Sequence, residues 1–147
     1  MALQQIATHK EGAEIYQGEA LCKQKVKEFL AEFRLPKGLI PVKSPVEVGL
    51  NRTTGFVWLK QQKKSEYRFK AIGKTVSHET ELTAFVEDRR MRELTGVKSK
   101  ELLIWMTVSD IFVSEHNPSK ITFLNNLTGL SRTFPVAAFE VEEEETK

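Results

Sequence analysis

A serine near the C-terminus has the surroundings that come nearest to a catalytic motif. The segment GLSRT at residues 129–133 begins like the GxSxG nucleophile elbow, in which small residues flank the serine so that the backbone can turn sharply from a strand into a helix. Thr133 occupies the position of the second glycine, and the residues after it continue a strand pattern. We therefore interpret Ser131 as a strand or turn residue. As a weak candidate nucleophile it would need a histidine base and an acid beside it.

The histidines and the single cysteine show no spacing that is typical of a metal site. His9, His78 and His116 lie far apart, and no HxH, HxxxH or CxxC pattern occurs. His78 and Glu79 fall in a strand pattern, where neighbouring side chains point to opposite faces, so we expect a solvated strand edge there. Cys22 lies on the apolar face of a predicted helix and is expected to be a buried thiol rather than a reactive one. We predict no metal, no cofactor and no internal disulfide.

Basic and aromatic residues gather in one polar stretch in the middle of the chain. The stretch from Lys60 to Ser65 predicts a hairpin loop, and only Glu66 opposes the positive charges. One hypothesis is a basic-aromatic surface that binds an anionic ligand or a lipid head group. The alternative is a solvated hairpin without a ligand. The candidate ligand-binding residues are Lys60, Lys63, Lys64, Tyr67, Arg68, Lys70 and Lys74.

Charge and hydropathy exclude several classes of protein. The chain of 147 residues has a net charge of +2, but residues 140–147 hold five acids and one lysine, which leaves +6 on the rest. This body is too weakly basic to indicate nucleic-acid binding. No apolar run of about 18 residues predicts a transmembrane helix. The polar N-terminus lacks the apolar core of a signal peptide, so we expect a reducing, cytoplasmic location and a monomer.

Helical periodicity appears once near the N-terminus. Residues 1–8 are expected to be loose, and residues 11–16 to form a short helix. A longer amphipathic helix follows and ends near Arg34, because Pro36 moves the residue before it out of the helical region. We expect this helix to pack on the domain; the alternative is that it binds a membrane surface or a partner. Its apolar stripe consists of Cys22, Val26, Phe29, Leu30 and Phe33.

Strand patterns fill the chain after residue 45. Residues 47–60 read as a hairpin, and its second strand is apolar on both faces, which predicts a central position in the core. The run LLIWM at residues 102–106 predicts a second central strand. Further strands are expected at Tyr67–Ala71, Thr75–Val86, Glu101–Val113, Lys120–Leu124 and Leu130–Phe134, with a short helix or turn at Asp88–Leu94.

These elements predict a mainly β fold of the α+β class. We expect an antiparallel β-barrel or roll of about seven strands, preceded by one amphipathic helix. Residues 18–140 would form a single β-rich domain, between an N-terminal segment of residues 1–17 and an acidic tail of residues 141–147.

Several ordered blocks resemble the plant domain-of-unknown-function family 538, over about residues 20–140. They are LPKGLIP at 35–41, EVG at 47–49, TGFVWLK at 54–60, LTGVKSKEL at 94–102 with Trp105, and GLSRTFPVAAF at 129–139. The resemblance implies a plant protein with a helix followed by a β-rich barrel or roll, and no established activity. The family has been compared in fold to lipid-binding bactericidal/permeability-increasing proteins, is associated with stress and growth responses, and includes members proposed to hydrolyse chlorophyll. Many members begin with a signal peptide, which this chain does not show.

Three functions are consistent with this sequence. The first is a non-enzymatic domain that binds an apolar or amphipathic ligand, lipid-like or pigment-like, among its two-faced apolar strands. The second is a protein-interaction or regulatory module that uses the leading helix, the basic hairpin or the acidic tail to bind a protein partner. The third is a serine esterase that acts on chlorophyll-like esters through Ser131, although an enzyme is the less favoured class.

Overall fold

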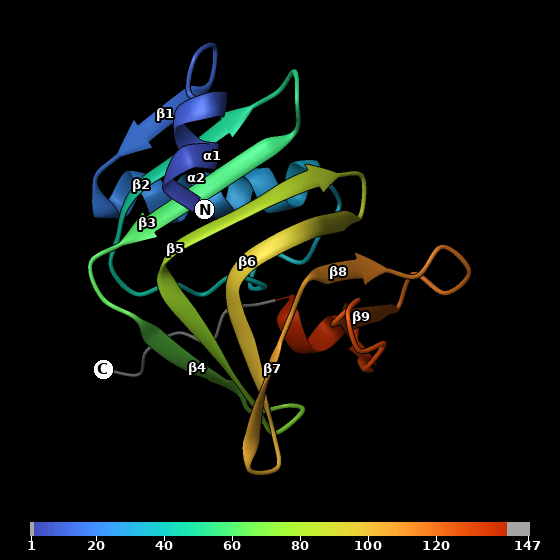
Figure 1. The fold of residues 1–147 in the computed structure, drawn as a ribbon. Coiled ribbons are helices and arrows are strands. Elements are labelled where there is room, and N and C mark those ends of the chain that lie inside the picture. The colour runs from blue at the N-terminus through green and yellow to red at the C-terminus, as the bar shows by residue number, and fades with distance from the viewer. Residues whose placement is uncertain (1, 141–147) are drawn as a thin grey trace.

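Strands dominate the computed structural model, which describes residues 2–140. The acidic tail predicted at residues 141–147 lies outside the described residues. Figure 1 shows the arrangement of the elements. In chain order they are α1 (Ala2–His9), β1 (Glu14–Gln17), α2 (Glu19–Glu32), β2 (Pro45–Asn51), β3 (Phe56–Gln61), β4 (Ser65–Phe69), β5 (Lys74–Glu87), β6 (Arg90–Glu101), β7 (Ile104–Thr107), β8 (Asp110–Val113), β9 (Lys120–Leu124), β10 (Ser131–Pro135) and the 3-10 helix η1 (Val136–Phe139).

All ten strands belong to one antiparallel sheet. Its main order is β1-β2-β3-β5-β6-β8-β9-β10, while β4 pairs with β5 and β7 pairs with β6. Among the described residues β1 pairs with β2 and β10 with β9, and no pairing joins these two end strands. The predicted β-rich class with a leading helix is therefore confirmed. The strands number ten rather than about seven, and the open sheet does not confirm a barrel.

The helix predicted from the apolar stripe is confirmed as α2. Cys22, Phe29 and Leu30 are buried on the sheet, and the thiol of Cys22 donates a hydrogen bond to the carbonyl of Tyr16. The helix ends in a Schellman motif: the amide of Leu35 donates to the carbonyl of Leu30 at 2.8 Å, and that of Arg34 to Ala31 at 3.0 Å. Arg34 occupies the left-handed position that glycine usually takes, with φ 60°.

The hairpin predicted at residues 47–60 is confirmed as β2 and β3. Asn51 closes the turn, since its Oδ1 accepts hydrogen bonds from the amides of Thr53 at 3.0 Å and Thr54 at 3.1 Å. Its Nδ2 donates to the carbonyl of His9 at 2.9 Å, which holds α1 against the hairpin. The central position predicted for Phe56–Leu59 is also confirmed, because β3 pairs with β2 on one edge and with β5 on the other.

β3 separates two apolar clusters. Phe56 and Trp58 pack with Ile6 of α1 on one face, and Leu59 belongs to the larger cluster under α2 on the other. Figure 1 shows the two helices on opposite faces of this part of the sheet. Gly49 lies opposite Trp58, and a Cβ at Gly49 would come within 2.2 Å of the indole ring. The absence of a side chain at Gly49 therefore makes room for the tryptophan.

The predictions for the N-terminus are wrong in detail. A helix occupies residues 2–9, which were expected to be loose, and residues 14–17 form a strand instead of a helix. β1 pairs with β2 in the register Ile15↔Gly49. Because β2 offers an open edge, pairing satisfies the backbone groups of this short segment better than a brief helix would.

The predictions for residues 88–113 are also wrong. Only Asp88 and Arg89 of the helix or turn expected at Asp88–Leu94 form a turn, and the rest begins the strand Arg90–Glu101. The strand expected over Glu101–Val113 is broken into the end of β6, β7 and β8. The run at residues 102–106 is not central: Leu102 and Leu103 are each 93% exposed. The turns contain residues other than glycine with positive φ, Arg89 at 61° and Leu102 at 55°, and Glu93, at 52°, lies within β6 where its register with β5 shifts.

The hairpin loop predicted at residues 60–65 is wrong as well. β3 and β4 do not pair with each other; both pair with the same edge of β5, β4 at its beginning and β3 further along. The register Ser65↔His78 is followed along β5 by Lys60↔Glu81. Residues 62–64 are thus a short break between two strands that run on in the same direction.

Candidate ligand site beside helix α2

Two adjacent stripes of α2 face two different spaces. Val26, Phe29, Leu30 and Phe33 line an apolar cavity against the sheet. Lys27, Ala31 and Arg34, one position further round the helix, line an open groove. The 3.6-residue period puts positions 27 and 31 on one face, directly beside the stripe that packs on the sheet, and Arg34 follows at the turn that ends the helix.

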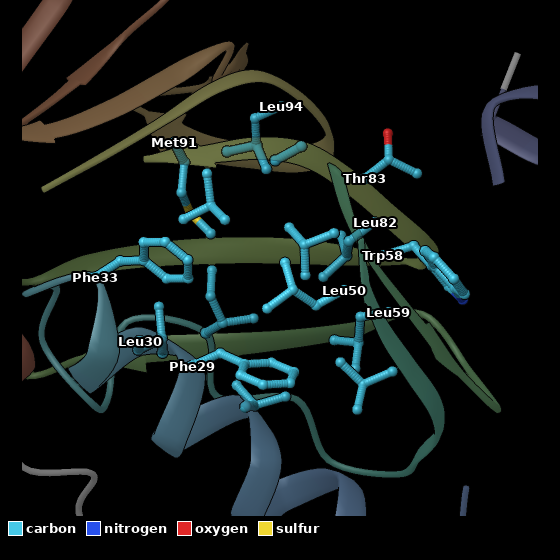
Figure 2. Close-up of a pocket in the computed structure, with 16 residues that line it drawn as sticks. Phe29, Leu30, Phe33, Leu50, Trp58, Leu59, Leu82, Thr83, Met91 and Leu94 are labelled. Atoms are coloured by element: carbon cyan, nitrogen blue, oxygen red, sulfur yellow. The ribbon is translucent and has the colours of Figure 1, made fainter. Parts of the chain in front are cut away.

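The cavity lies between α2 and the inner face of the sheet and has a volume of about 60 Å3. Figure 2 shows Phe29, Leu30 and Phe33 on the helix side, with Leu50, Leu82 and Met91 facing them from the strands. Trp58 and Thr83 line it from the strands but point away from its centre (Figure 2). A space with these walls offers water few hydrogen-bond partners, and apolar cavities of this kind stay dry. It can accept a short apolar group.

The groove is larger and charged. Its volume is about 770 Å3, within the range of small-molecule sites. Within residues 2–140, its lining combines apolar residues, of which Leu35, Pro36 and Val113 are buried and form its floor, with four basic residues and one acidic residue. It is lined by Lys27, Ala31, Arg34, Leu35, Pro36, Lys37, Arg89, Val113, Pro118, Val136 and Glu140.

The end of α2 is held firmly against the turn between β5 and β6. The amide of Arg89 donates to the carbonyl of Phe33 at 2.6 Å, and the Nε of Arg34 donates to Asp88 at 2.8 Å. The hydrogen bond from Arg34 lowers the pKa of the Asp88 carboxyl and raises that of the guanidinium. Asp88 also lies 3.7 Å from Arg89. One carboxylate thus serves two arginines, and the wall of the groove keeps a net positive charge.

The predicted basic-aromatic residues lie elsewhere, along the β3–β4 edge of β5. Three of the lysines face acids: Lys60 lies 3.8 Å from Glu47, Lys64 3.4 Å from Glu79 and Lys74 3.1 Å from Glu101. Tyr67 is half-buried, with its ring edge-on to Phe69. The remaining members, Lys63, Arg68 and Lys70, are exposed. Both the proposal that this surface binds a ligand and the alternative of a solvated surface stay predictions.

Ser131 begins β10, opposite Leu124, and is exposed to solvent. Its backbone is a regular strand, and no hydrogen bond to its hydroxyl occurs among residues 2–140. His116 is exposed in the segment after β8. A role of Ser131 in catalysis stays a prediction without a base beside the hydroxyl.

The prediction of a solvated edge at His78 is wrong. β5 has β4 on one edge and β6 on the other, so His78, between Ser65 and Val97, has no free edge to occupy. Its side chain is fully buried, and neither ring nitrogen has a hydrogen-bond partner within residues 2–140. Burial lowers the pKa of the imidazole to about 4. The part of the chain that the structure describes contains no group of three His, Cys, Asp or Glu residues that could hold a metal ion.

Sequence reasoning missed the cations of the groove. Lys27 belongs to the polar side of a predicted helix, Lys37 to a connector and Arg89 to a turn, so their spacing in the sequence does not indicate that they lie around one groove. One local signal was available: Arg34 immediately follows the helix and precedes Leu35-Pro36, a position where the chain must turn.

Comparison with known proteins agrees with the resemblance of the ordered blocks quoted above. No helix within residues 2–140 is long and apolar enough to cross a membrane. No curated protein and no solved structure matches the chain. The profile of a family described as "Protein of unknown function, DUF538" matches residues 26–140, which include the second half of α2 and every strand from β2 to β10. The chain therefore belongs to the DUF538 family.

Proposed function

We propose that this domain binds a small amphipathic molecule, lipid-like or pigment-like, that carries an anionic head group. The observation that carries the proposal is the groove beside α2, about 770 Å3 in volume, which combines an apolar floor with a basic rim. The head group would lie against Lys27, Lys37 and Arg89, and the apolar part along the floor and toward the cavity under the helix.

Charge supports an anionic head group. Among residues 2–140, four basic side chains line the groove against one acidic side chain, Glu140, and Asp88 beside it is already engaged by Arg34. Charge-assisted hydrogen bonds from lysine and arginine to a carboxylate or phosphate are about twice as strong as neutral ones. Lys37 forms no ion pair with any carboxylate within residues 2–140 and is exposed at the rim. A cationic ligand would meet repulsion at the same place.

The cavity supports an apolar tail. It is lined by the stripe of α2 next to the one that lines the groove, and at about 60 Å3 it holds a short hydrocarbon segment rather than a whole chain. Phe33, half-buried at the last turn of α2, lines the cavity next to the groove-lining Arg34. Rotation of the Phe33 ring would extend the apolar cavity toward the groove.

Two single-chain amphiphiles with the same tail test the proposal. Dodecyl phosphate and dodecyltrimethylammonium are titrated below their micelle concentrations and followed by calorimetry and by amide NMR shifts. We expect dodecyl phosphate to bind and to shift the amides of α2 and of the β5–β6 turn, and the cationic amphiphile not to bind. Lys27→Glu and Lys37→Glu should each weaken the phosphate by roughly tenfold, because each replaces an attractive charge with a repulsive one.

The matched control is Lys10→Glu, an equal charge change at an exposed lysine that follows α1 and does not line the groove. A second variant, Ala84→Val, adds methyl groups to a buried wall of the cavity and should weaken dodecyl phosphate without lowering stability. No binding by the wild-type protein, or an equal loss in the Lys10 variant, would overturn the proposal.

A further inference from the structure

Four consecutive apolar residues project into solvent at the turn between β6 and β7. Leu102 and Leu103 are each 93% exposed, Ile104 is 66% exposed and Trp105 is 38% exposed. Figure 1 shows this hairpin extending past the rest of the sheet, at the bottom of the view. We call residues 102–105 the apolar tip. Single exposed leucines are common on protein surfaces, but a contiguous exposed apolar group usually marks an interaction site.

The apolar tip is not required by the fold. Leu102 has φ 55°, a backbone conformation that glycine or asparagine adopts more easily than leucine. The buried part of the hairpin ends at Met106, which is 4% exposed. Polar residues at 102 and 103 would therefore fit the turn at least as well and would avoid the exposure of two large hydrophobic side chains to water.

Basic residues surround the apolar tip. Lys98 and Lys100 are exposed on β6, and the Nζ of Lys100 lies 5.7 Å from the centre of the Trp105 ring. Neither lysine forms an ion pair with a carboxylate within residues 2–140. The acid nearest the tip, Glu101, is only 7% exposed. Its Oε1 accepts hydrogen bonds from Lys74 at 3.1 Å and from Arg132 at 3.0 Å, so two bases offset its single negative charge.

From this arrangement we infer that the apolar tip inserts into the interface of an anionic lipid bilayer. Leu102 and Leu103, at the end of the hairpin, would reach the acyl chains. Trp105, one step back, would lie at the level of the head groups, where tryptophan is enriched in membrane proteins. Lys98 and Lys100 would contact anionic head groups, and each basic residue near such a surface strengthens binding about fivefold.

The shape of the apolar tip favours a bilayer over a protein partner. A stable protein interface buries about 800 Å2 on each side, which four residues at the end of a narrow hairpin cannot supply. A bilayer accepts a small convex element, because lipids rearrange around it and the surrounding charges supply the rest of the affinity. The inference does not depend on any ligand in the groove beside α2, since the apolar tip shares no residue with it.

Vesicle binding tests the inference directly. Wild-type protein is mixed with large unilamellar vesicles of phosphatidylcholine alone, or of phosphatidylcholine and phosphatidylserine in equal parts, and bound protein is separated by flotation. We expect binding to the anionic vesicles that weakens with added salt, and little binding to phosphatidylcholine. Brominated lipids should quench tryptophan fluorescence, and the quenching reports Trp105 because Trp58 is only 1% exposed within the core.

Three variants locate the contact. The double variant Leu102→Asp, Leu103→Asp should reduce the partition onto anionic vesicles by about 100-fold, since it removes both inserted side chains and adds two negative charges. Lys98→Gln with Lys100→Gln should reduce it by at least about tenfold and flatten its dependence on salt. The control is Leu127→Asp, a leucine that is also 93% exposed but lies on the β9–β10 turn, and it should bind like wild type.

Circular dichroism and thermal unfolding establish that each variant is folded. Failure of the wild-type protein to float with anionic vesicles would overturn the inference, as would an equal loss in the Leu127 variant. Sedimentation that shows a dimer which the Leu102 and Leu103 substitutions dissociate would also overturn it, in favour of an interface between two copies of this chain.

Discussion

Acid should weaken this fold through His78. The imidazole is fully buried in β5, and within residues 2–140 both of its nitrogens lack hydrogen-bond partners. Burial disfavours the charged form and lowers the pKa from 6.5 to about 4. Unfolding exposes the ring and restores its ordinary pKa. The folded and unfolded states therefore bind different numbers of protons over a defined range of pH.

The sign and size of the effect follow from proton linkage. Between pH 6.5 and about 4 the unfolded chain binds a proton that the folded protein does not, so the free energy of unfolding falls as the pH falls. Above pH 6.5 the contribution of His78 to this pH dependence vanishes. At about pH 4.5 the loss is about 2.5 kcal/mol, because each unit of difference in pKa corresponds to about 1.4 kcal/mol. The loss levels off at roughly 3 kcal/mol below the folded pKa.

His78→Leu isolates this contribution. Urea unfolding of wild type and variant at about pH 7.5 and about pH 4.5 gives four free energies, and titration of the carboxylates cancels in the difference between the two proteins. We expect wild type to lose about 2.5 kcal/mol more than the variant on acidification. At neutral pH the variant should be at least as stable as wild type, since it removes two buried polar atoms that have no hydrogen-bond partners within residues 2–140.

Two results would refute this reasoning. The first is that the variant loses as much stability on acidification as wild type does. The second is an NMR titration of the folded protein in which the His78 ring changes protonation near pH 6.5. Either result would mean that the imidazole reaches water or a hydrogen-bond partner in the folded state.

Four further substitutions test the packing and the polar contacts. Gly49→Ala should lower the free energy of unfolding by about 1–3 kcal/mol, because the new methyl group would lie within 2.2 Å of the Trp58 ring; an unchanged melting temperature would contradict this. Glu101→Ala should cost about 2 kcal/mol in urea unfolding, since it leaves two half-buried bases without their acid. Lys23→Ala, which breaks an exposed ion pair with Glu19, should change the free energy of unfolding by less than about 0.5 kcal/mol. Similar losses in the Glu101 and Lys23 variants would contradict the conclusion that the ion pairs of Glu101 contribute more to stability. Asn51→Ala should cost about 2 kcal/mol and speed hydrogen exchange in α1, because it removes the turn contacts and the bond to the end of that helix; unchanged exchange would show that α1 is held by other contacts.

The best predicted elements are those in which local and tertiary preferences agree. The stripe of α2 has the helical period over several turns, and its end is marked by Pro36. The hairpin of β2 and β3 has turn residues that suit its conformation, with Asn51 as the hydrogen-bonding side chain and Gly55 at φ 82°. Each of these signals indicates a backbone conformation as well as a degree of burial, and each was confirmed.

The missed turns have no such signal. Arg89, Glu93 and Leu102 take positive φ although their residue types do not favour it, so the sequence shows no break where the chain reverses or bulges. An apolar run such as residues 102–106 then looks like a buried strand. Its exposure depends on where the turn falls, and that is decided by pairing between β6 and β7, with Glu101 opposite Ile104.

The candidate site could not be predicted for a different reason. The residues around the groove come from α2, the connector after it, the β5–β6 turn, β8 and η1, which meet only through the order of strands in the sheet. His78 is a similar case, because alternation along a strand gives the face of a side chain but not the number of neighbouring strands. The predicted basic cluster, by contrast, used residues that are close in sequence, and those spread out along one edge of β5.

The arrangement of β5 and β6 has a consequence for how the chain folds. These two strands pair with each other along most of their length. On its other edge β5 pairs first with β4 and then with β3, and on its other edge β6 pairs with β7 and β8. β5 and β6 therefore join strands β3 and β4 to strands β7 and β8. They are joined by a turn of only two residues, Asp88 and Arg89. Closing this short loop costs little chain entropy compared with any other long pairing in the domain. We expect the β5–β6 hairpin to form in the folding transition state, and the end strands β1 and β10 to add last.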